Sequence, residues 1–390
     1  MSPGFDPEEQ LPGPPDPWAP STIPARRASA PYLMTEMIAA EPALAARVAK
    51  VAAHDPATGA LVDWIQDAAT RGDPITTTGC GTSEHAAMAA AELLANAIGP
   101  QRGHLVRSRQ ALDVARDPQA GGVLVGFTHE GGTWATNEAL DRSRRAGART
   151  ALVTVSDRSP GAARAELVLQ TREQDQSWCH TVGYLAPVVV AAVLAAAIAG
   201  ESFDGIAMRA LLEVSTDEAQ AEAAANGLAA CARLIVAGTG IDYVSARELA
   251  LKIEEGSGLP ATALHTETLR HGHLAAATAQ TGLVLFLTDV EREGEPVRER
   301  ASGALRSARM LGMPTVAILG ARLGPDVPLE LTPAGRLTAP EANQIRPVAE
   351  AILGSAIPLQ LLAERLARAL GRNPDPIGRD DPRQAAAADA

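Results

Sequence analysis

The feature that most constrains the fold is an internal repeat of a strand, a glycine-rich turn and a helix. Residues 232–258 (ARLIVAGTGIDYVSARELALKIEEGSG) restate residues 75–99 (ITTTGCGTSEHAAMAAAELLANAIG), and residues 283–320 restate the series around GVLVGFTHEGGTWAT. The glycines that end the two repeated strands, Gly79 and Gly238, are 159 positions apart. Two consecutive strand-helix series in nearly constant register predict two copies of one module.

Within the first copy, short apolar runs predict strands, and segments with apolar residues at i, i+3 and i+4 predict helices between them. The expected strands are 75–79, 104–108, 122–128, 148–156 and 165–171. Strands that alternate with helices imply a parallel sheet covered on both faces. We therefore predict an α/β protein with a first module and its N-terminal helices at 31–205, a linker helix at 206–228 and a second module at 229–372.

The two ends of the chain differ in composition from the rest. Residues 1–30 and 373–390 are rich in proline, alanine and acidic residues and have no periodic apolar face. This composition predicts a disordered tail at 1–30 and a mobile tail at 373–390. The first twenty residues are acidic, unlike a signal peptide. The longest apolar run, 185–200, is shorter than the ~18 residues that a membrane span needs. We expect a cytoplasmic protein that does not bind membranes.

Charge and cysteine spacing exclude further classes. The net charge of −12 argues against nucleic-acid binding, which depends on basic surface. Cys80, Cys179 and Cys231 lie far apart without a metal-ligand spacing, so neither a disulfide framework nor a structural zinc site is indicated. The glycine-rich turns match neither the P-loop nor the dinucleotide fingerprint. We expect no cofactor.

The turn after the first strand is a candidate ligand loop. In open parallel sheets, ligands bind beyond the carboxyl ends of the strands, where helix amino termini offer free N–H groups. Gly81 allows close approach of the backbone, and the hydroxyls of Thr82 and Ser83 can donate to a sugar or phosphate oxygen. Serine and threonine also cap helices that bind nothing. The turn alone leaves both interpretations open.

The helix after the second glycine turn carries a candidate reactive face. Glu248, Lys252 and Glu255 stand at i, i+4 and i+7, which places them on one side of the helix. Such a face is either a solvated salt-bridge ladder or part of a site. His271 follows the next expected strand, and a carboxylate and a histidine in one pocket can move protons between neighbouring carbons. The histidines of 265–273 match no standard ligand spacing, so we expect no metal.

Taken together, GCGTS, the Glu-x3-Lys-x2-Glu helix and LRHG resemble the double sugar isomerase (SIS) family. This family includes the isomerase half of glucosamine-6-phosphate synthase, sugar-phosphate isomerases and deaminases, and fructosamine-phosphate deglycases. The resemblance covers about residues 60–372. It implies two tandem SIS modules, each a parallel five-stranded sheet flanked by helices in a flavodoxin-like three-layer sandwich. It also implies a homodimer that binds a small sugar or sugar phosphate.

The resemblance implies roles for individual residues. The glutamate that matches Glu255 shuttles a proton between C1 and C2 through an enediol or enolamine. The histidine that matches His271 helps open the sugar ring and reaches the pocket from the neighbouring subunit, while Glu248 and Lys252 match residues that orient this machinery. The substrate is held by loops that match Gly81, Thr82 and Ser83, and Thr128, His129, Glu130, Gly131 and Thr133.

Several departures from the family bear on function. No glutaminase domain with its cysteine nucleophile is recognised here, where position 2 is Ser2, so we expect no ammonia transfer from glutamine. The stretch 373–390 lacks the lysine that synthase-type members place in their tail. Trp178, within QSWCHTVGY, is expected to reshape one wall of the site. The resemblance thus predicts an isomerase or a deaminase/deglycase, with a non-catalytic carbohydrate-binding regulator as the alternative.

The second loop contains the most consequential departure. Where the family commonly has Ser-x-Ser-Gly-x-Thr, this chain has Thr-His-Glu-Gly-Gly-Thr at 128–133. An ionised Glu130 within ~4 Å of a phosphate would cost on the order of 4 kcal/mol at an effective dielectric constant of 20. Glu130 can point away, pair with His129 or an arginine, or face a hydroxyl or ammonium of an unphosphorylated ligand. The sequence leaves these three possibilities open.

Overall fold

The computed structural model describes residues 2, 4–289 and 294–388. Its first sheet has five parallel strands in the order β2-β1-β3-β4-β5. Their bounds are β1 Ile75–Gly79, β2 Val106–Gln110, β3 Val123–Phe127, β4 Arg149–Thr154 and β5 Leu167–Gln170. Every strand expected in the first copy is present, which confirms the interpretation of these apolar runs.

The second sheet repeats the first. It comprises β6 Arg233–Gly238, β7 Ala261–His265, β8 Thr281–Leu287, β9 Thr315–Gly320 and β10 Gly335–Ala339. Its strand order, β7-β6-β8-β9-β10, is that of the first sheet, and its strand pairs are also parallel. This is the order 2-1-3-4-5 of flavodoxin-like sheets. The prediction of two tandem α/β modules with five-stranded parallel sheets is confirmed.

The repeated glycine turns have a steric cause. A Cβ on Gly79 would lie 2.5 Å from the carbonyl oxygen of Ser83, and one on Gly238 would lie 2.3 Å from that of Asp242. In both copies the helix therefore returns too close to the strand end for any side chain. The glycine two positions later has a φ of 58° in both copies, a conformation that other residues rarely adopt.

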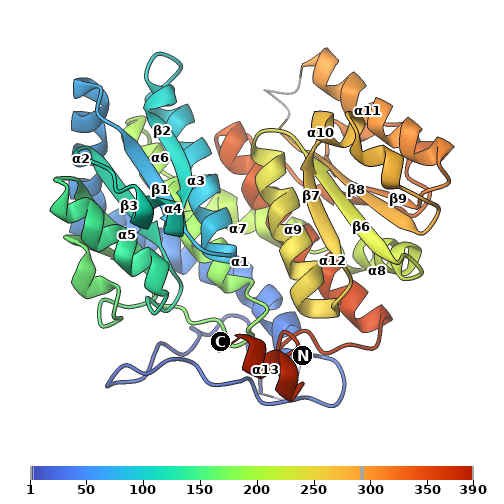
Figure 1. Ribbon diagram of the computed structural model, residues 1–390, viewed down its shortest axis with the longest axis horizontal. Coiled ribbons are helices and arrows are strands. Elements are labelled where there is room, and N and C mark those ends of the chain that lie inside the picture. The colour runs from blue at the N-terminus through green and yellow to red at the C-terminus, as the bar shows by residue number, and fades with distance from the viewer. Residues whose placement is uncertain (1, 3, 290–293, 389–390) are drawn as a thin grey trace.

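Helices cover both faces of each sheet (Figure 1). The helices before and around the first sheet are α1 Leu33–His54, α2 Pro56–Arg71, α3 Thr82–Ile98, α4 Ala111–Arg116, α5 Trp134–Arg145 and α6 Val182–Ile198. Those that follow are α7 Gly205–Val214, α8 Glu218–Leu228, α9 Ile241–Ser257, α10 Thr266–Arg270, α11 Glu295–Met310, α12 Pro347–Ala369 and α13 Pro382–Ala388. Helices α3, α6, α9 and α12 lie between the two sheets, so each module is a three-layer sandwich whose inner layer faces the other module.

One apolar core joins the two modules. It contains Leu94 of α3, Val189 of α6, Leu249 of α9 and Leu353 of α12, all fully buried. Smaller clusters lie on the outer faces, under α4 and α5 in the first module and under α10 and α11 in the second. The modules therefore pack through their inner helices as one body.

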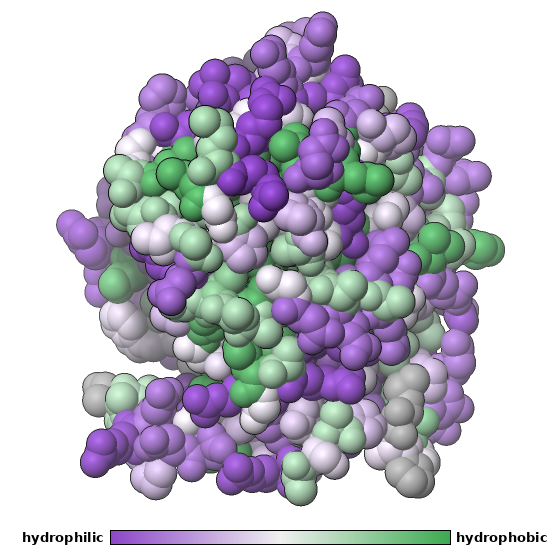
Figure 2. Space-filling view, turned by 90° about the vertical axis from the view of Figure 1, so that its right-hand side faces the viewer, coloured by the Kyte–Doolittle hydropathy of each residue, from purple (hydrophilic) through white to green (hydrophobic). Residues whose placement is uncertain are grey.

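Helix α6 corresponds to the long apolar run and is buried along almost its whole length. No helix in the described part of the chain is long and apolar enough to cross a membrane. On the face seen from the side of the second module, apolar patches are interspersed among hydrophilic residues (Figure 2). Exposed apolar side chains such as Met310 and Leu329 belong to this module.

The segment expected as one linker helix at 206–228 is instead two helices, α7 and α8. Asp217 caps the start of α8: its side chain accepts a hydrogen bond of 3.0 Å from the backbone N–H of Gln220. Helix α7 packs against α1, whereas α8 packs against β10 and α12. Each of the two helices therefore packs against helices or strands of the modules instead of only linking them.

The expected tails also differ from the prediction. Residues 4–31 form neither helices nor strands, yet Leu11 is only 5% exposed and its N–H donates to Glu173 at 2.8 Å. Near the other end, the carboxylate of Asp375 accepts from the backbone N–H groups of Leu33 and Met34 at 3.0 and 2.8 Å. Both segments are held in place by contacts of individual residues. Such contacts produce no periodic apolar pattern, so the sequence does not reveal them.

Candidate active site

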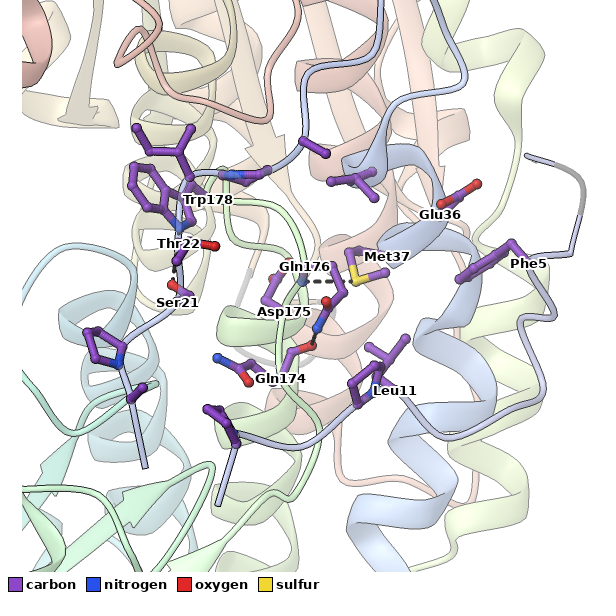
Figure 3. Close-up of a pocket in the computed structure, with 18 residues that line it drawn as sticks. Phe5, Leu11, Ser21, Thr22, Glu36, Met37, Gln174, Asp175, Gln176 and Trp178 are labelled. Atoms are coloured by element: carbon purple, nitrogen blue, oxygen red, sulfur yellow. Dashed lines mark hydrogen bonds between the residues drawn. The ribbon is translucent and has the colours of Figure 1, made fainter. Parts of the chain in front are cut away.

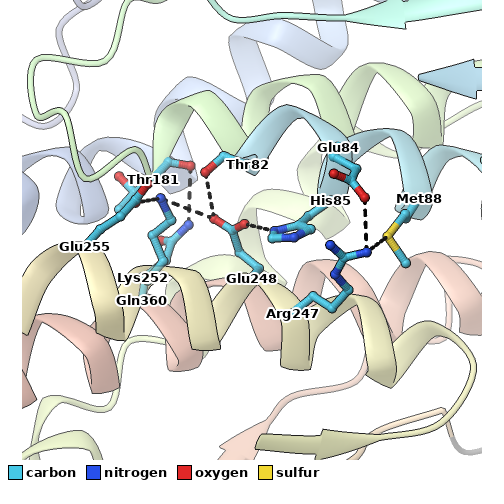
Figure 4. Close-up of polar contacts among 10 residues, drawn as sticks. All are labelled: Thr82, Glu84, His85, Met88, Thr181, Arg247, Glu248, Lys252, Glu255 and Gln360. Carbon is cyan, nitrogen blue, oxygen red and sulfur yellow. Dashed lines mark hydrogen bonds and ion pairs between the residues drawn. The ribbon is translucent and has the colours of Figure 1, made fainter. Parts of the chain in front are cut away.

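Helix α9 presents its charged face to α3 at the seam between the modules (Figure 4). Glu248 and Lys252 have fully buried side chains, whereas the side chain of Glu255 is 23% exposed. A solvated salt-bridge ladder would be exposed along its length. The burial therefore favours the second interpretation of this spacing, a built polar cluster with one accessible carboxylate.

Glu248 is fixed by three partners. Its carboxylate lies 2.7 Å from Nδ1 of His85 and 3.7 Å from Nζ of Lys252, and it accepts a long hydrogen bond of 3.5 Å from the hydroxyl of Thr82. Two of these partners come from the first turn of α3, directly after the GCG turn. The candidate ligand loop of the first module is thus joined to the charged helix of the second.

Lys252 lies between the two glutamates, because its ammonium group also forms a short ion pair with Glu255. Burial alone would lower the pKa of Lys252, but the carboxylates of Glu255 and Glu248 raise it above the ordinary value. Burial raises the pKa of Glu255, against the opposing effect of Lys252. The cluster holds a permanent cation beside a carboxylate that is more basic than a free one.

The loop 174–181 packs on the other side of Lys252. The sulfur of Cys179 lies 3.8 Å from the backbone oxygen of Lys252, and Gln360 of α12 donates to the carbonyl of Thr181 at 3.3 Å. Burial raises the pKa of the Cys179 thiol well above its ordinary value, so it remains a neutral packing group. This loop therefore lies directly beside the charged cluster.

The second candidate loop carries hydroxyls but little positive charge. The hydroxyl oxygens of Thr128 and Thr133 lie 3.5 Å apart. Nε2 of His129 accepts a hydrogen bond of 3.0 Å from the backbone N–H of Asp175. Burial lowers the pKa of His129 to about 4, and nearby His180 adds to the effect. His129 is therefore neutral near pH 7 and brings no charge to an anion.

Glu130 is held by neutral donors. One of its carboxylate oxygens accepts from the backbone N–H of Ser21 at 3.1 Å and from the side-chain amide of Gln174 at 2.8 Å. Among the residues that the structure describes, it hydrogen-bonds neither to His129 nor to an arginine. Its negative charge is therefore not neutralised by a cationic partner of the kind that the sequence left open.

Of the remaining expected residues, Gly81 and Ser83 flank Thr82 beside the charged cluster, whereas Trp178 and His271 contact other groups. Trp178 donates from its indole N–H to the hydroxyl of Ser21 at 3.1 Å. Gly81 is exposed, Ser83 is half-buried, and Gly131 adopts a φ of 72°. His271 follows α10 and its side chain is 74% exposed, with Nε2 3.2 Å from Glu267. Among the described residues of a single chain, the ion-pair partner of His271 is Glu267, whereas those of Lys252 are Glu248 and Glu255.

Two residues at the cluster were not expected from the sequence. His85 follows Thr82 by three positions, so the helical spacing in GCGTSEH carried the signal that both point to one side. Asp175 is buried and accepts from the backbone N–H groups of Ser177, Thr181 and Gly183 at 3.0, 2.7 and 3.1 Å. Its role in shaping the loop had no sequence signal.

In the described part of the chain, no group of three histidine, cysteine, aspartate or glutamate side chains is placed to hold a metal ion. The polar cluster at the seam consists of the side chains of Thr82, His85, Glu248, Lys252 and Glu255. Its chemistry is that of carboxylates, an ammonium, imidazole and hydroxyl groups.

Comparison with solved structures identifies the architecture. The C-terminal domain of glucosamine-fructose-6-phosphate aminotransferase from Francisella tularensis aligns with a TM-score of 0.73 at 18% identity, covering 90% of this chain and 99% of that one. A tagatose-6-phosphate ketose/aldose isomerase from Escherichia coli aligns with a TM-score of 0.70 at 19% identity, covering 91% and 98%. The chain has the double SIS fold.

Other similarities agree with this fold. A glucosamine-6-phosphate deaminase from Thermotoga maritima aligns with a TM-score of 0.59 at 18% identity, covering 84% of this chain and 96% of the deaminase. The glutamine–fructose-6-phosphate aminotransferase (isomerizing) of Aeropyrum pernix is 26% identical over 375 residues, 92% of this chain. The chain spans 57% of the length of that relative. No family model matches the sequence.

Proposed function

We propose that this double SIS protein binds a sugar or sugar phosphate and transfers a proton between its C1 and C2 atoms. The reaction is either aldose–ketose isomerisation or deamination/deglycation of an amino-sugar phosphate. The observation that carries the proposal is the buried Lys252 between Glu248 and the partly accessible Glu255. The similar proteins named above are an isomerizing aminotransferase, a ketose/aldose isomerase and a deaminase, which supports the same range of reactions.

In the proposed mechanism Glu255 is the base. A proton on the carbon next to a carbonyl is acidic, and a carboxylate whose pKa is raised by burial is better suited to remove it near neutral pH. The ammonium of Lys252 then offsets the negative charge that develops on the substrate oxygen. The protonated Glu255 returns the proton to the neighbouring carbon. Glu248 positions Lys252, and His85 and Thr82 position Glu248.

The proposed substrate loops are those that resemble the family's. Gly81, Thr82 and Ser83 follow β1, and Thr128 and Thr133 follow β3, so both loops lie beyond the carboxyl ends of neighbouring strands. Their hydroxyl and backbone N–H groups are suited to sugar oxygens. Whether a phosphate enters the second loop depends on Glu130.

A homodimer is part of the proposal. His271 is highly exposed in the single chain, so it is free to enter the site of a second copy, as the family resemblance implies. Light scattering at micromolar concentration is expected to give the mass of a dimer. A monomer under conditions of full activity would remove His271 from the mechanism.

The experiment that tests the function replaces Glu255 by glutamine, which keeps the shape but not the base. A thermal-shift screen of hexoses, hexosamines and their 6-phosphates first supplies a ligand, since binding to the folded state raises the melting temperature. Exchange of the C2 hydrogen with deuterated water then reports proton transfer. We expect E255Q to lose roughly 10²- to 10⁴-fold in exchange rate and to retain binding.

The neighbouring Glu254 supplies the control, because it is exposed on the same helix turn. E254Q is expected to exchange at the wild-type rate. Full activity in E255Q would refute the proposed base. Ligand binding without exchange in the wild type would favour the second candidate, a carbohydrate-binding regulator, which the absence of a lysine at 373–390 supports.

A further inference from the structure

The N-terminal segment crosses the carboxyl edge of the first sheet. The N–H of Leu11 donates to Glu173 at 2.8 Å, and the carbonyl of Pro12 accepts from the N–H of Gln174 at 3.2 Å. Both partners belong to the loop that follows β5. Residues 11–25, which we call the N-terminal wall, thus lie over the edge where parallel sheets bind ligands.

The N-terminal wall is also bonded to the candidate substrate residues. Ser21 donates from its backbone to Glu130 at 3.1 Å, and its hydroxyl accepts from the indole N–H of Trp178 at 3.1 Å. Gln174 donates to the same oxygen of Glu130 at 2.8 Å. The carboxylate that departs from the family pattern is therefore one of the groups that hold the N-terminal wall. Glu173, Gln174, Trp178 and Arg158 are others.

A cavity of about 690 Å³ lies between the wall and the loop 174–178 (Figure 3). This volume falls in the range of small-molecule sites. Much of its lining is apolar and includes Leu11, Pro15, Ile23, Met37 and Trp178. Its lining residues include no lysine, arginine or histidine.

The two acids that line the cavity already have partners. Asp175 accepts from three backbone N–H groups, and Glu36 is paired with Arg27 at 2.6 Å. Arg379 stacks on the ring of Trp178 at 4.9 Å and is not a lining residue. The cavity therefore offers apolar surface and no cation to an incoming group.

Loop 174–181 lies next to both the cavity and the charged cluster. Loop 174–181 contributes Trp178 to the cavity, and one residue further along the sulfur of Cys179 contacts the carbonyl of Lys252 at 3.8 Å. Loop 174–181 is therefore in contact with both the cavity and the charged cluster.

We propose that the N-terminal wall is part of the substrate site, and that the substrate places an uncharged, apolar substituent instead of a phosphate between the wall and Trp178. This inference rests on the proposed function and names its substrate class, a sugar or amino sugar with an apolar group at the end away from C1 and C2. Glu130 does not line the cavity, but its two donors, Ser21 and Gln174, do, so a phosphate at this end would approach a carboxylate that has no cationic partner. At ~4 Å and an effective dielectric constant of 20, the repulsion weakens binding roughly a thousandfold.

The test is calorimetric binding of three probes to the full chain: glucosamine, its 6-phosphate and its 6-O-benzyl ether. In the wild type we expect the benzyl ether to bind at least tenfold tighter than glucosamine, and the 6-phosphate to bind most weakly. E130S is expected to bind the 6-phosphate at least tenfold better and the benzyl ether less well, because it frees the loop and releases the wall. E138S, which removes a half-buried glutamate of α5 that pairs with Arg142, should match the wild type.

A second measurement follows the wall directly. Trypsin is expected to cut after Arg26 or Arg27 more slowly when the benzyl ether is bound. Cleavage should be faster in S21P, which removes both the N–H that donates to Glu130 and the hydroxyl that accepts from Trp178. Tightest binding of the 6-phosphate by the wild type, equal affinity for the three probes, binding of none, or unchanged cleavage would each overturn the inference. Loss of exchange in E255Q alongside any of these results would leave the proposed function standing.

Discussion

Replacing Lys252 by methionine tests whether its charge holds the seam together. Methionine keeps most of the apolar stem and removes the ammonium, so Glu248 and Glu255 lose the cation between them. At 3.7 Å, the attraction between Lys252 and Glu248 amounts to about 4 kcal/mol for an effective dielectric constant of 20. Because a buried charge is left without its partner, we expect K252M to lower the free energy of unfolding by about 3–5 kcal/mol.

The assay is urea unfolding at pH 7, followed by far-ultraviolet circular dichroism. The chain contains one other lysine, Lys50, which is exposed, and K50M is expected to stay within about 0.5 kcal/mol of the wild type. In the double variant K252M/E248Q, the loss should be smaller than the sum of the single losses by about 0.5–3 kcal/mol. A loss below about 1 kcal/mol in K252M, together with additive effects, would refute the account of this cluster.

Two further predictions concern the second ligand loop and its surroundings. Burial lowers the pKa of His180 to about 3, so below pH 6.5 an unfolded chain takes up a proton there that the folded chain does not. The free energy of unfolding should therefore fall as the pH drops from about 6.5 towards 3. In urea unfolding, H180Q should reduce the slope of this free energy against pH by up to about 1.4 kcal/mol per pH unit. Replacing the exposed His54 by glutamine should leave the slope unchanged. Equal slopes in all three proteins would contradict this. Gly131→Ala should lower the free energy of unfolding by about 1–3 kcal/mol in thermal unfolding, because the new Cβ would lie 2.3 Å from the Ser159 hydroxyl and the residue has a φ of 72°. Gly132→Ala, which has open space around it, should cost much less. Equal losses in the two variants would count against the steric argument.

The sheets could be predicted from the sequence because each buried strand is a short apolar run between turn residues. In a parallel sheet both faces are covered, so the run at 123–127 is apolar throughout and bounded by glycine and threonine. The second module could be recognised because Gly79 recurs as Gly238. In both modules the helix passes so close to the end of the strand that only glycine fits there. These are local signals, and the local structure they predict is the structure observed.

The candidate site was only partly predictable. The spacing of Glu248, Lys252 and Glu255 placed them on one face, but their burial depends on α3 of the other module, which is about 160 positions away in the sequence. No local pattern indicates which helix covers which. The contact of His85 with Glu248 could therefore be recognised only once the two modules were placed against each other.

The N-terminal segment shows the opposite limit. Its composition predicted a disordered tail, but Leu11 donates to Glu173, and Ser21 hydrogen-bonds to both Glu130 and Trp178 in loops of the first module. A contact made by one residue at a time has no periodicity. Sequence patterns detect segments that fold by repetition and miss segments that bind by individual contacts.

The pairing of α3 with α9 has a consequence for symmetry. The two helices occupy the same place in the two copies, and two identical modules related by a twofold axis would have to present the same residues to each other. A histidine facing a glutamate across such an axis would occur twice, at two equivalent points. Because both copies lie in one chain, α3 contributes His85 and Thr82 and α9 contributes Glu248 and Lys252 at a single point. Covalent linkage of the two copies thus allowed the seam around Glu248 to become chemically asymmetric, with a hydroxyl and an imidazole from α3 and a carboxylate and an ammonium from α9.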